Sequence, residues 1–443
     1  MKQSRCTSWV LIGFAGALTI FPCGIRVPEA HGQSFDQEID RRAGAIESRL
    51  VAWRRDFHEH PELSNREFRT SRIVADHLRS LGLEVNAPVA RTGVVGTLRG
   101  GKPGPAVALR ADMDALPVTE EVNLPFASKV RATYGGREVG VMHACGHDMH
   151  TAILMGVADV LAGMRADIPG TIRFIFQPAE EGAPAGEEGG AWLMIKEGAL
   201  ENPKVSAVFG LHVFPEPLGQ VTYRPGAWMA ASDSFRILVR GSQTHGAQPW
   251  RGADPIVASA QIVLGLQTIV SRQIDITEAP AVISIGSIHG GVRWNIIPDT
   301  VELAGTIRSF DPAMQQDIHE RIRRISEMIA RAAGATAQVD IEKGNPITYN
   351  DPELTERMAP TLVRLLGKES VRVTAPATVS EDFSLYQTQV PGLFFFLGIT
   401  PKGTDPAAAA PNHSPHFYAD EGALTTGVRA LANLALDFLR QAK

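Results

Sequence analysis

The chain has 443 residues and a formal net charge of −5, and 44% of its residues are hydrophobic and 21% are charged. This composition excludes a disordered, collagen-like or coiled-coil protein, and the length predicts two domains. The net negative charge offers no global attraction to nucleic acid or anionic membranes, and three cysteines are too few for a disulfide scaffold.

Residues 1–32 are predicted to be an export signal. A positive start precedes the apolar run Trp9–Phe21, and small residues at Ala30 and Gly32 precede the expected cleavage site. The run has 13 residues, fewer than the ~20 that a membrane-spanning helix needs, which argues against the alternative of a permanent anchor. We therefore expect a periplasmic or secreted protein without a stable membrane anchor, whose mature chain keeps Cys145 as its single cysteine.

Residues 33–230 alternate between helices and short apolar strands, which is typical of an α/β layer fold. The predicted helices are Ile39–Glu59, Glu67–Leu81 and Asp148–Met164, and the predicted strands are Val94–Arg99, Val107–Ala111, Thr171–Gln177 and Val205–Leu211. Because these strands are nearly continuous apolar runs, we expect a mostly parallel central sheet that is buried on both faces.

Residues 231–343 follow a different pattern, which we interpret as a smaller α+β domain inserted into the first. The expected elements are an alternating strand Ser234–Arg240, a helix from Pro255 to about Arg272, strands Ala281–Ile288 and Thr300–Arg308, and an amphipathic helix Pro312–Ala333. The larger domain is then discontinuous, with residues 33–230 and 344–443. Its second part is expected to hold a strand Leu393–Gly398 and a last helix from about Asp420 to Arg440.

The densest group of potential metal ligands lies in the segment His143–His150, just before a predicted helix. Cys145 and His147 are two residues apart, and Gly146 between them lets the backbone turn tightly. A thiolate and an imidazole both suit zinc and its neighbours. The alternative is a polar helix start with a core cysteine, but three histidines, one cysteine and one aspartate within eight residues favour a metal site.

Further candidates follow other predicted strands. Glu180 and Glu181 come just after the strand Thr171–Gln177, and the carboxyl ends of strands form the binding crevice of open α/β sheets. Adjacent carboxylates there can divide the work, one binding a metal and the other moving protons; a solvated acidic loop is the alternative. His212 also follows an apolar strand, and Asp112 follows another, from which its carboxylate could orient the imidazoles of metal ligands.

A loop before the last helix adds His413 and His416. One cysteine, three histidines and one glutamate exceed the four ligands of a tetrahedral zinc, which predicts a two-metal site. Such a site favours hydrolysis of an amide or ester. The chain has no Gly-x-Ser-x-Gly elbow, Walker loop or dinucleotide-binding glycine motif.

Several ordered motifs resemble the M20 metallopeptidase family, and most closely its amidohydrolases of N-acyl amino acids, such as hippurate and auxin-conjugate hydrolases. The motifs are Arg110–Pro117, His143–Ala152, Gln177–Glu181, Gly210–His212 and Ser380–Ser384, with further matches at His58–Leu63, Thr244–Pro249, Asn295–Pro298 and Gly305–Arg308. The resemblance runs from about residue 40 to the C-terminus.

The resemblance implies a site for two divalent metal ions (Zn, Mn, Co or Ni). The implied ligands are Cys145, His147, Glu181, His212 and His413. Glu180 would be the general acid/base, which deprotonates a metal-bridging water and then protonates the leaving nitrogen. The family motif favours His413 over the neighbouring His416 as a ligand.

The resemblance also implies that residues 231–343 form a lid and a dimerisation surface, and hence a homodimer or higher homo-oligomer. His245 would approach the oxyanion, either in its own subunit or in the site of a partner subunit. Asn295 and Arg308 are candidates to hold the substrate carboxylate, which suits a bidentate guanidinium; packing within the lid is the alternative for each.

The expected reaction is hydrolysis of the amide bond of an N-acetyl or aromatic-acyl amino acid, which releases a carboxylic acid and an amino acid. One alternative is a dipeptidase or carboxypeptidase that acts on short peptides with the same site. The other is a catalytically silent protein that binds metal or amino acids. The presence of Glu180 and all five implied ligands speaks against a silent protein.

Overall fold

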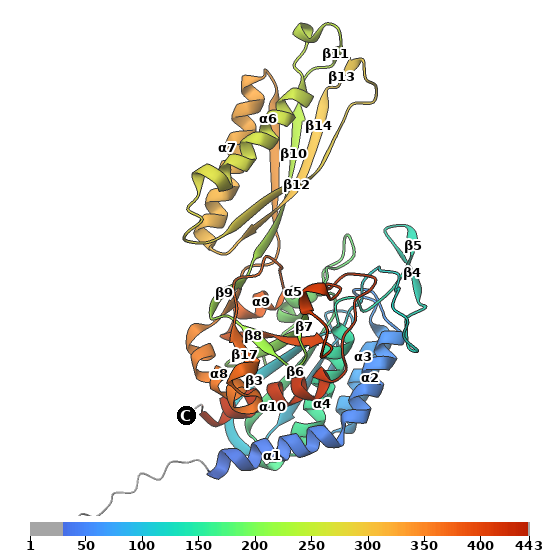
Figure 1. The fold of residues 1–443 in the computed structure, drawn as a ribbon, viewed down its shortest axis with the longest axis vertical. Coiled ribbons are helices and arrows are strands. Elements are labelled where there is room, and N and C mark those ends of the chain that lie inside the picture. Colours follow the sequence, from blue (N-terminus) through green and yellow to red (C-terminus); the bar gives the residue numbers. More distant parts are fainter. Residues whose placement is uncertain (1–29, 442–443) are drawn as a thin grey trace, which may run out of the picture.

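The computed structural model describes residues 30–441. Nearly all of the predicted export signal lies outside the described residues, so it stays a prediction. The described chain forms two units, one around an eight-stranded sheet and one around a four-stranded sheet, and Figure 1 shows them stacked along the long axis of the molecule. No helix among residues 30–441 combines the length and apolar character needed to cross a membrane.

The larger unit is built on a sheet whose central strands are parallel. Its strands are β1 (Glu84–Val89), β2 (Gly93–Arg99), β3 (Lys102–Asp112), β6 (Pro169–Gln177), β7 (Val208–Pro217), β8 (Val221–Tyr223), β17 (Val371–Val373) and β18 (Gly392–Thr400). The order is β1-β2-β6-β3-β7-β18-β8-β17, and the pairings from β6 to β18 are parallel. The pairings of β1 with β2, β2 with β6 and β18 with β8 are antiparallel. This mostly parallel sheet confirms the predicted α/β class.

Helices cover both faces of this sheet. One face carries α1 (Ala30–Ala45), α2 (Glu47–Glu59), α3 (Phe68–Ser80), α4 (His147–Ala162), α8 (Pro352–Leu366) and α10 (Ala423–Gln441), and the other carries α5 (Gly190–Lys196) and α9 (Phe383–Gln387). Successive residues of β3 alternate between the two cores, with Leu109 in the first and Ala108 in the second. α4 is buried along nearly its whole length, because it packs against the sheet, α2 and α10.

The smaller unit spans residues 231–343. Its strands β10 (Ala231–Arg240), β12 (Ala281–Gly290), β14 (Thr300–Ser309) and β15 (Thr336–Lys343) pair antiparallel in the order β12-β14-β10-β15. α6 (Pro255–Thr268) and α7 (Pro312–Ala332) cover one face of this sheet (Figure 1). Both helices begin with an aspartate cap, Asp254 or Asp311, followed by proline in the first turn.

Short strand pairs mark the rim, the junction and the tip. They are β4 (Arg131–Tyr134) with β5 (Arg137–Gly140) at the rim of the larger unit, β9 (Gly226–Met229) with β16 (Thr348–Asn350) near the junction, and β11 (Thr244–His245) with β13 (Ile296–Ile297) at the far tip of the smaller unit (Figure 1). The chain therefore crosses between the units twice, just after β9 and just before β16.

Several elements were not predicted, and β15 and α8 are the longest of them. β15 adds an edge strand to the smaller sheet, and its side chains are only exposed or half-buried, so its sequence lacks the apolar run of a core strand. α8 continues through Pro360, although proline inside a helix removes a hydrogen bond and costs about 3 kcal/mol. Burial of Leu354, Met358 and Leu362 in the main core offsets this cost.

Candidate metal centre

The candidate site lies where the larger unit faces the smaller one. A cavity of about 430 Å³ is lined from the larger unit by Cys145, Glu180, Glu181, His212 and His413, and from the smaller unit by Ser232 and Arg308. The parallel register brings these segments together, because Asp112 of β3 lies opposite Gln177 of β6, and Arg110 lies opposite Gly210 of β7. The chain that follows each strand therefore emerges at the same edge of the sheet.

Three of the other four predicted ligands lie close to the Cys145 thiol. Its Sγ lies 3.3 Å from Nε2 of His212 and 3.3 Å from Nε2 of His413, and Nε2 of His413 lies 3.0 Å from Oε1 of Glu181. Ligand atoms of a tetrahedral ion with bonds of 2.0–2.3 Å are roughly 3.5 Å apart. The spacing between these side chains is therefore the spacing of a shared metal ion.

The ligand atoms fall into two groups that share the thiol. Cys145, His147 and His212 form one group, and Cys145, Glu181 and His413 form the other, with potential ligand atoms within 4.8 Å of one another in each. Cys145 belongs to both groups, so its thiolate would be available to ions held by either group. The structure thus brings together all five residues that the sequence predicts as ligands.

The imidazole tautomers fit metal binding. Nδ1 of His147 lies 2.9 Å from the Asp114 carbonyl, and Nδ1 of His212 lies 2.7 Å from the Val213 carbonyl. Carbonyls only accept, so both rings carry a hydrogen on Nδ1, which leaves Nε2 as the nitrogen that can bind a metal. Nε2 of His147 is buried without a hydrogen-bond partner among the described residues, a state that a metal ion would relieve.

Local backbone geometry places these ligands. Gly146 has φ +89°, and a Cβ there would lie 2.3 Å from Cγ2 of Val213, so glycine is required between Cys145 and His147. His413 itself has φ +71°, and its N–H donates to the Ala144 carbonyl at 2.7 Å. A non-glycine residue in the left-handed region is strained, and here the hydrogen bond to Ala144 holds His413 in this conformation against the loop that carries Cys145.

Electrostatics also favour cations at this site. Burial lowers the pKa of His147, but the nearby Asp112 and Asp114 carboxylates outweigh it and raise that pKa to about 10. Burial and the carboxylates of Glu181 and Glu180 raise the pKa of the Cys145 thiol well above its ordinary value. The side chains alone therefore hold protons that divalent cations would displace. The donor set of thiolate, imidazoles and carboxylate fits a pair of Zn-like ions.

Glu180 sits beside the ligands within a buried acidic group. Its Oε2 lies 4.0 Å from Nε2 of His147, and its carboxylate groups with those of Glu381 and Asp382. Burial and the charges of Glu381 and Glu181 raise the pKa of Glu180 well above its ordinary value. A carboxyl with a raised pKa next to a hydrolytic metal site is suited to proton transfer.

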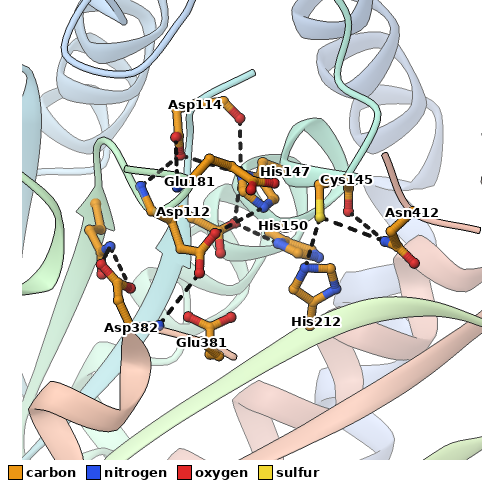
Figure 2. A network of polar contacts seen from close by, with 12 residues as sticks. Asp112, Asp114, Cys145, His147, His150, Glu181, His212, Glu381, Asp382 and Asn412 are labelled. Atoms are coloured by element: carbon orange, nitrogen blue, oxygen red, sulfur yellow. Dashed lines mark hydrogen bonds and ion pairs between the residues drawn. The ribbon is translucent and has the colours of Figure 1, made fainter. Parts of the chain in front are cut away.

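Asp112 holds a different imidazole from the one expected. Nε2 of His150 accepts from the Val213 N–H at 2.8 Å, so its Nδ1 donates to Oδ1 of Asp112 at 2.5 Å. Oδ1 of Asp112 is 3.8 Å from Nδ1 of His147, and that nitrogen is held by the carbonyl of Asp114 instead. Asp112 therefore bonds His150 directly and reaches the predicted ligand His147 only as a longer ion pair, because the Asp114 carbonyl accepts the Nδ1–H of His147 (Figure 2).

Three carboxylates that sequence reasoning did not select complete the site (Figure 2). Asp114 accepts from the N–H groups of Glu180 and Glu181 at 3.0 and 3.1 Å, which fixes the turn that carries them. Arg110, fully buried, bonds Asp112 at 2.6 Å, Glu381 at 2.9 Å and Asp382 at 2.8 Å. Asp114, Glu381 and Asp382 all lie in motifs of the predicted resemblance, which was the one available signal.

The residues predicted to bind substrate separate into two places. Arg308 lines the cavity from β14, opposite Ser232. Its guanidinium donates to the Ile307 carbonyl at 3.1 Å and pairs with no carboxylate among residues 30–441. His245 and Asn295 instead lie at the tip of the smaller unit, where β11 pairs with β13 (Figure 1). Within one chain, Asn295 therefore does not join Arg308 at the cavity.

Comparisons with known proteins agree with this geometry. A family model described as peptidase family M20/M25/M40 matches residues 108–437. Thermostable carboxypeptidase 2 of Saccharolobus solfataricus is 44% identical over 397 residues, 89% of this chain and 96% of that protein. N-acetylcysteine deacetylase of Bacillus subtilis is 40% identical over 401 residues, 90% of this chain and 99% of that protein.

A solved structure has the same fold. The Bacillus subtilis YXEP protein, described as a dinuclear metal binding peptidase from the M20 family, is 38% identical and matches 90% of this chain and 99% of its own with a TM-score of 0.75. The predicted resemblance is confirmed. The chain is a metal-dependent hydrolase and belongs to peptidase family M20/M25/M40.

Proposed function

We propose that this hydrolase cleaves the amide bond of N-acyl amino acids, and that Arg308 binds the carboxylate of the amino-acid half. The observation that carries the proposal is one cavity lined by Glu180, by four of the five predicted metal ligands and by an arginine without a carboxylate partner among the described residues. A buried or half-buried guanidinium that lacks an anion is suited to bind one from a ligand.

In the proposed reaction, the bound metal ions polarise the amide carbonyl and lower the pKa of water. Glu180 accepts a proton from the attacking water and donates it to the leaving nitrogen. Arg308 orients the substrate by its carboxylate, and Asp114 keeps Glu180 in place by holding its backbone N–H. The thiolate and imidazole ligands support Zn, Mn, Co or Ni as the metals.

A carboxypeptidase is the second candidate, supported by the 44% identity to the protein named thermostable carboxypeptidase 2. Both candidates need a free carboxylate on the leaving amino acid, so they share the role of Arg308. They differ in the other half of the substrate, which is a simple acyl group in one and an aminoacyl group in the other.

Replacing Arg308 with alanine is expected to lower kcat/KM for N-acetyl and N-benzoyl amino acids by about 30-fold. This factor corresponds to roughly 2 kcal/mol of transition-state stabilisation, the contribution of a charge-assisted hydrogen bond to the substrate carboxylate. The measurement is steady-state kinetics of the Zn and Mn forms with N-acyl amino acids, dipeptides and N-acyl amines that lack the carboxylate. The amines should be poor substrates of the wild type and should lose little further in the variant.

Arg236→Ala is the matched control, since Arg236 lies on the same sheet and pairs with Glu302 outside the cavity. A higher kcat/KM for dipeptides than for every N-acyl amino acid would favour the carboxypeptidase. Equal losses on substrates with and without the carboxylate would contradict the role of Arg308.

We also propose a homodimer in which the tip of the smaller unit completes the site of a second subunit. His245 lies on this tip, away from its own cavity. Trp250, Val292 and Trp294, on the loops around β11 and β13, are 77%, 97% and 90% exposed, an unusual amount of exposed apolar surface in so small a region. A second copy that covers this region would bring His245 towards the partner's ligands.

Subunit complementation tests this arrangement. Glu180→Gln and His245→Ala should each be inactive alone, yet their mixture, after subunit exchange, should regain about a quarter of wild-type activity, because half of the dimers are hybrids with one complete site each. The measurement is activity after mixing, alongside mass determination in solution. A mixture that stays inactive although hybrids form would contradict a shared site.

We propose, finally, that the protein acts outside the cytoplasm, in the periplasm or secreted. The support is the charged start, short apolar run and small residues of the N-terminus. In an oxidising compartment, metal ligation would protect the single thiol that the mature chain keeps.

A further inference from the structure

The geometry points to a second cavity as the pocket for the acyl group of the substrate. This inference rests on the proposed function and names a part of the same site. The second cavity has a volume of about 290 Å³, and its lining includes Leu63, Leu116, Pro117, Tyr134, Glu181 and Pro184. Glu181 is the one residue that lines both cavities. The two cavities therefore adjoin at a metal ligand, where the amide bond must be cleaved.

The second cavity suits an uncharged group. Its arginine, Arg66, is already paired, with NH2 2.6 Å from Oε1 of Glu187 and NH1 2.9 Å from the Asn65 carbonyl. The Ser64 side chain also lines this cavity, and its hydroxyl already donates to Oδ2 of Asp114 at 2.7 Å. Apart from the ligand Glu181, the cavity thus offers no unpaired charge, and apolar side chains make up much of its wall. A carboxylate would find no partner there, whereas an acyl chain or ring would bury apolar surface.

The first cavity suits the other half of the substrate. It holds Arg308 together with the polar residues Ser232, Asn345 and Ser380, which can bind a carboxylate. An apolar wall of Phe214, Met229, Val379 and Phe396 also lines this cavity and would contact the amino-acid side chain. A substrate with its amide at the metals would then place its two halves in two chemically different pockets.

The size of the second cavity supports a medium-sized acyl group. A volume of about 290 Å³ is roughly ten times the ~30 Å³ that one water occupies in the liquid, which leaves room for a short aliphatic or a benzoyl group. Tyr134, at the end of β4 on the rim hairpin, is 52% exposed and offers a ring for stacking against an aromatic acyl group.

Filling the second cavity tests the assignment. Ala185 lines it on an exposed loop, so Ala185→Phe can narrow it without disturbing the core. We expect the ratio of kcat/KM for N-benzoyl to that for N-acetyl derivatives of one amino acid to fall about tenfold or more, as steric rejection in a pocket allows. Tyr134→Ala, which removes the ring from the exposed hairpin, should lower the same ratio through lost stacking.

Two matched variants complete the design. Ala52→Phe places the same ring at an exposed position of α2 and should leave the ratio unchanged. Val379→Phe narrows the first cavity and should change the preference among amino-acid side chains but not the acyl ratio. A fall of the acyl ratio in Val379→Phe with none in Ala185→Phe would overturn the assignment, as would an equal loss on all acyl groups in Ala185→Phe. A wild type that hydrolyses no N-acyl amino acid would instead refute the proposed function itself.

Discussion

Glu180→Gln is expected to lower kcat for an N-acyl amino acid by about 100- to 10,000-fold, the contribution typical of a general acid/base, while the metal content stays near that of the wild type. Glutamine is nearly isosteric with glutamate but cannot accept the proton of the attacking water. The five implied ligands stay intact, because Glu180 is not among them. Kinetics and metal analysis of the same preparation are the two measurements.

The surroundings of Glu180 make this variant informative. Glu381 and Asp382 lie beside it, so loss of the Glu180 charge relieves repulsion and should not destabilise the fold. Glu188→Gln is the matched control, since Glu188 lies in the same loop, is exposed and pairs with Lys196 at 3.0 Å. Normal turnover in Glu180→Gln would show that another group moves the proton.

Removal of the metals is the second change with a large expected effect. Chelation should abolish activity, and Zn, Mn, Co or Ni should restore it. It should also lower the melting temperature, because an ion that binds only the folded state at 1,000 times its Kd contributes about 4 kcal/mol. Without the ions, burial and the carboxylates of Glu181 and Glu180 keep the pKa of the Cys145 thiol well above its ordinary value. Metal analysis, activity and thermal unfolding are measured on the same samples.

Glu180→Gln provides the control for the stability measurement. This variant is expected to have little activity, yet its melting temperature should fall on chelation as much as that of the wild type. Cys145→Ser should bind less metal and show a smaller fall. Full activity after complete removal of the metals would refute a metal-dependent reaction.

The sequence predicted the parts of the site that local spacing or a strand end determines. Cys145 and His147 are close in the chain, and Glu180 and Glu181 directly follow an apolar strand, so their residue types and positions were enough. Long-range contacts could not be read in this way. Arg110 bonds Asp382 across 272 residues, and nothing in either segment alone indicates the pair.

Elements whose burial depends on tertiary packing could also not be predicted from the sequence. The predicted strand 205–211 ended before His212, whereas β7 continues to Pro217, because β18 pairs with it along nearly its whole length. Similarly, α8 was not predicted, and core contacts stabilise it although it contains Pro360. The positions of His245 and Asn295 at the tip depend on how far β10 and β14 extend, which the motifs around these residues do not state.

The two chain crossings between the units have a consequence for selectivity. Arg308 belongs to the smaller unit, and the predicted metal ligands belong to the larger one. In the proposed reaction, the smaller unit would thus bind the carboxylate of the substrate, and the larger unit would bind its amide. The relative placement of the two units would then limit the length of the leaving group, because its carboxylate and its amide nitrogen contact different units.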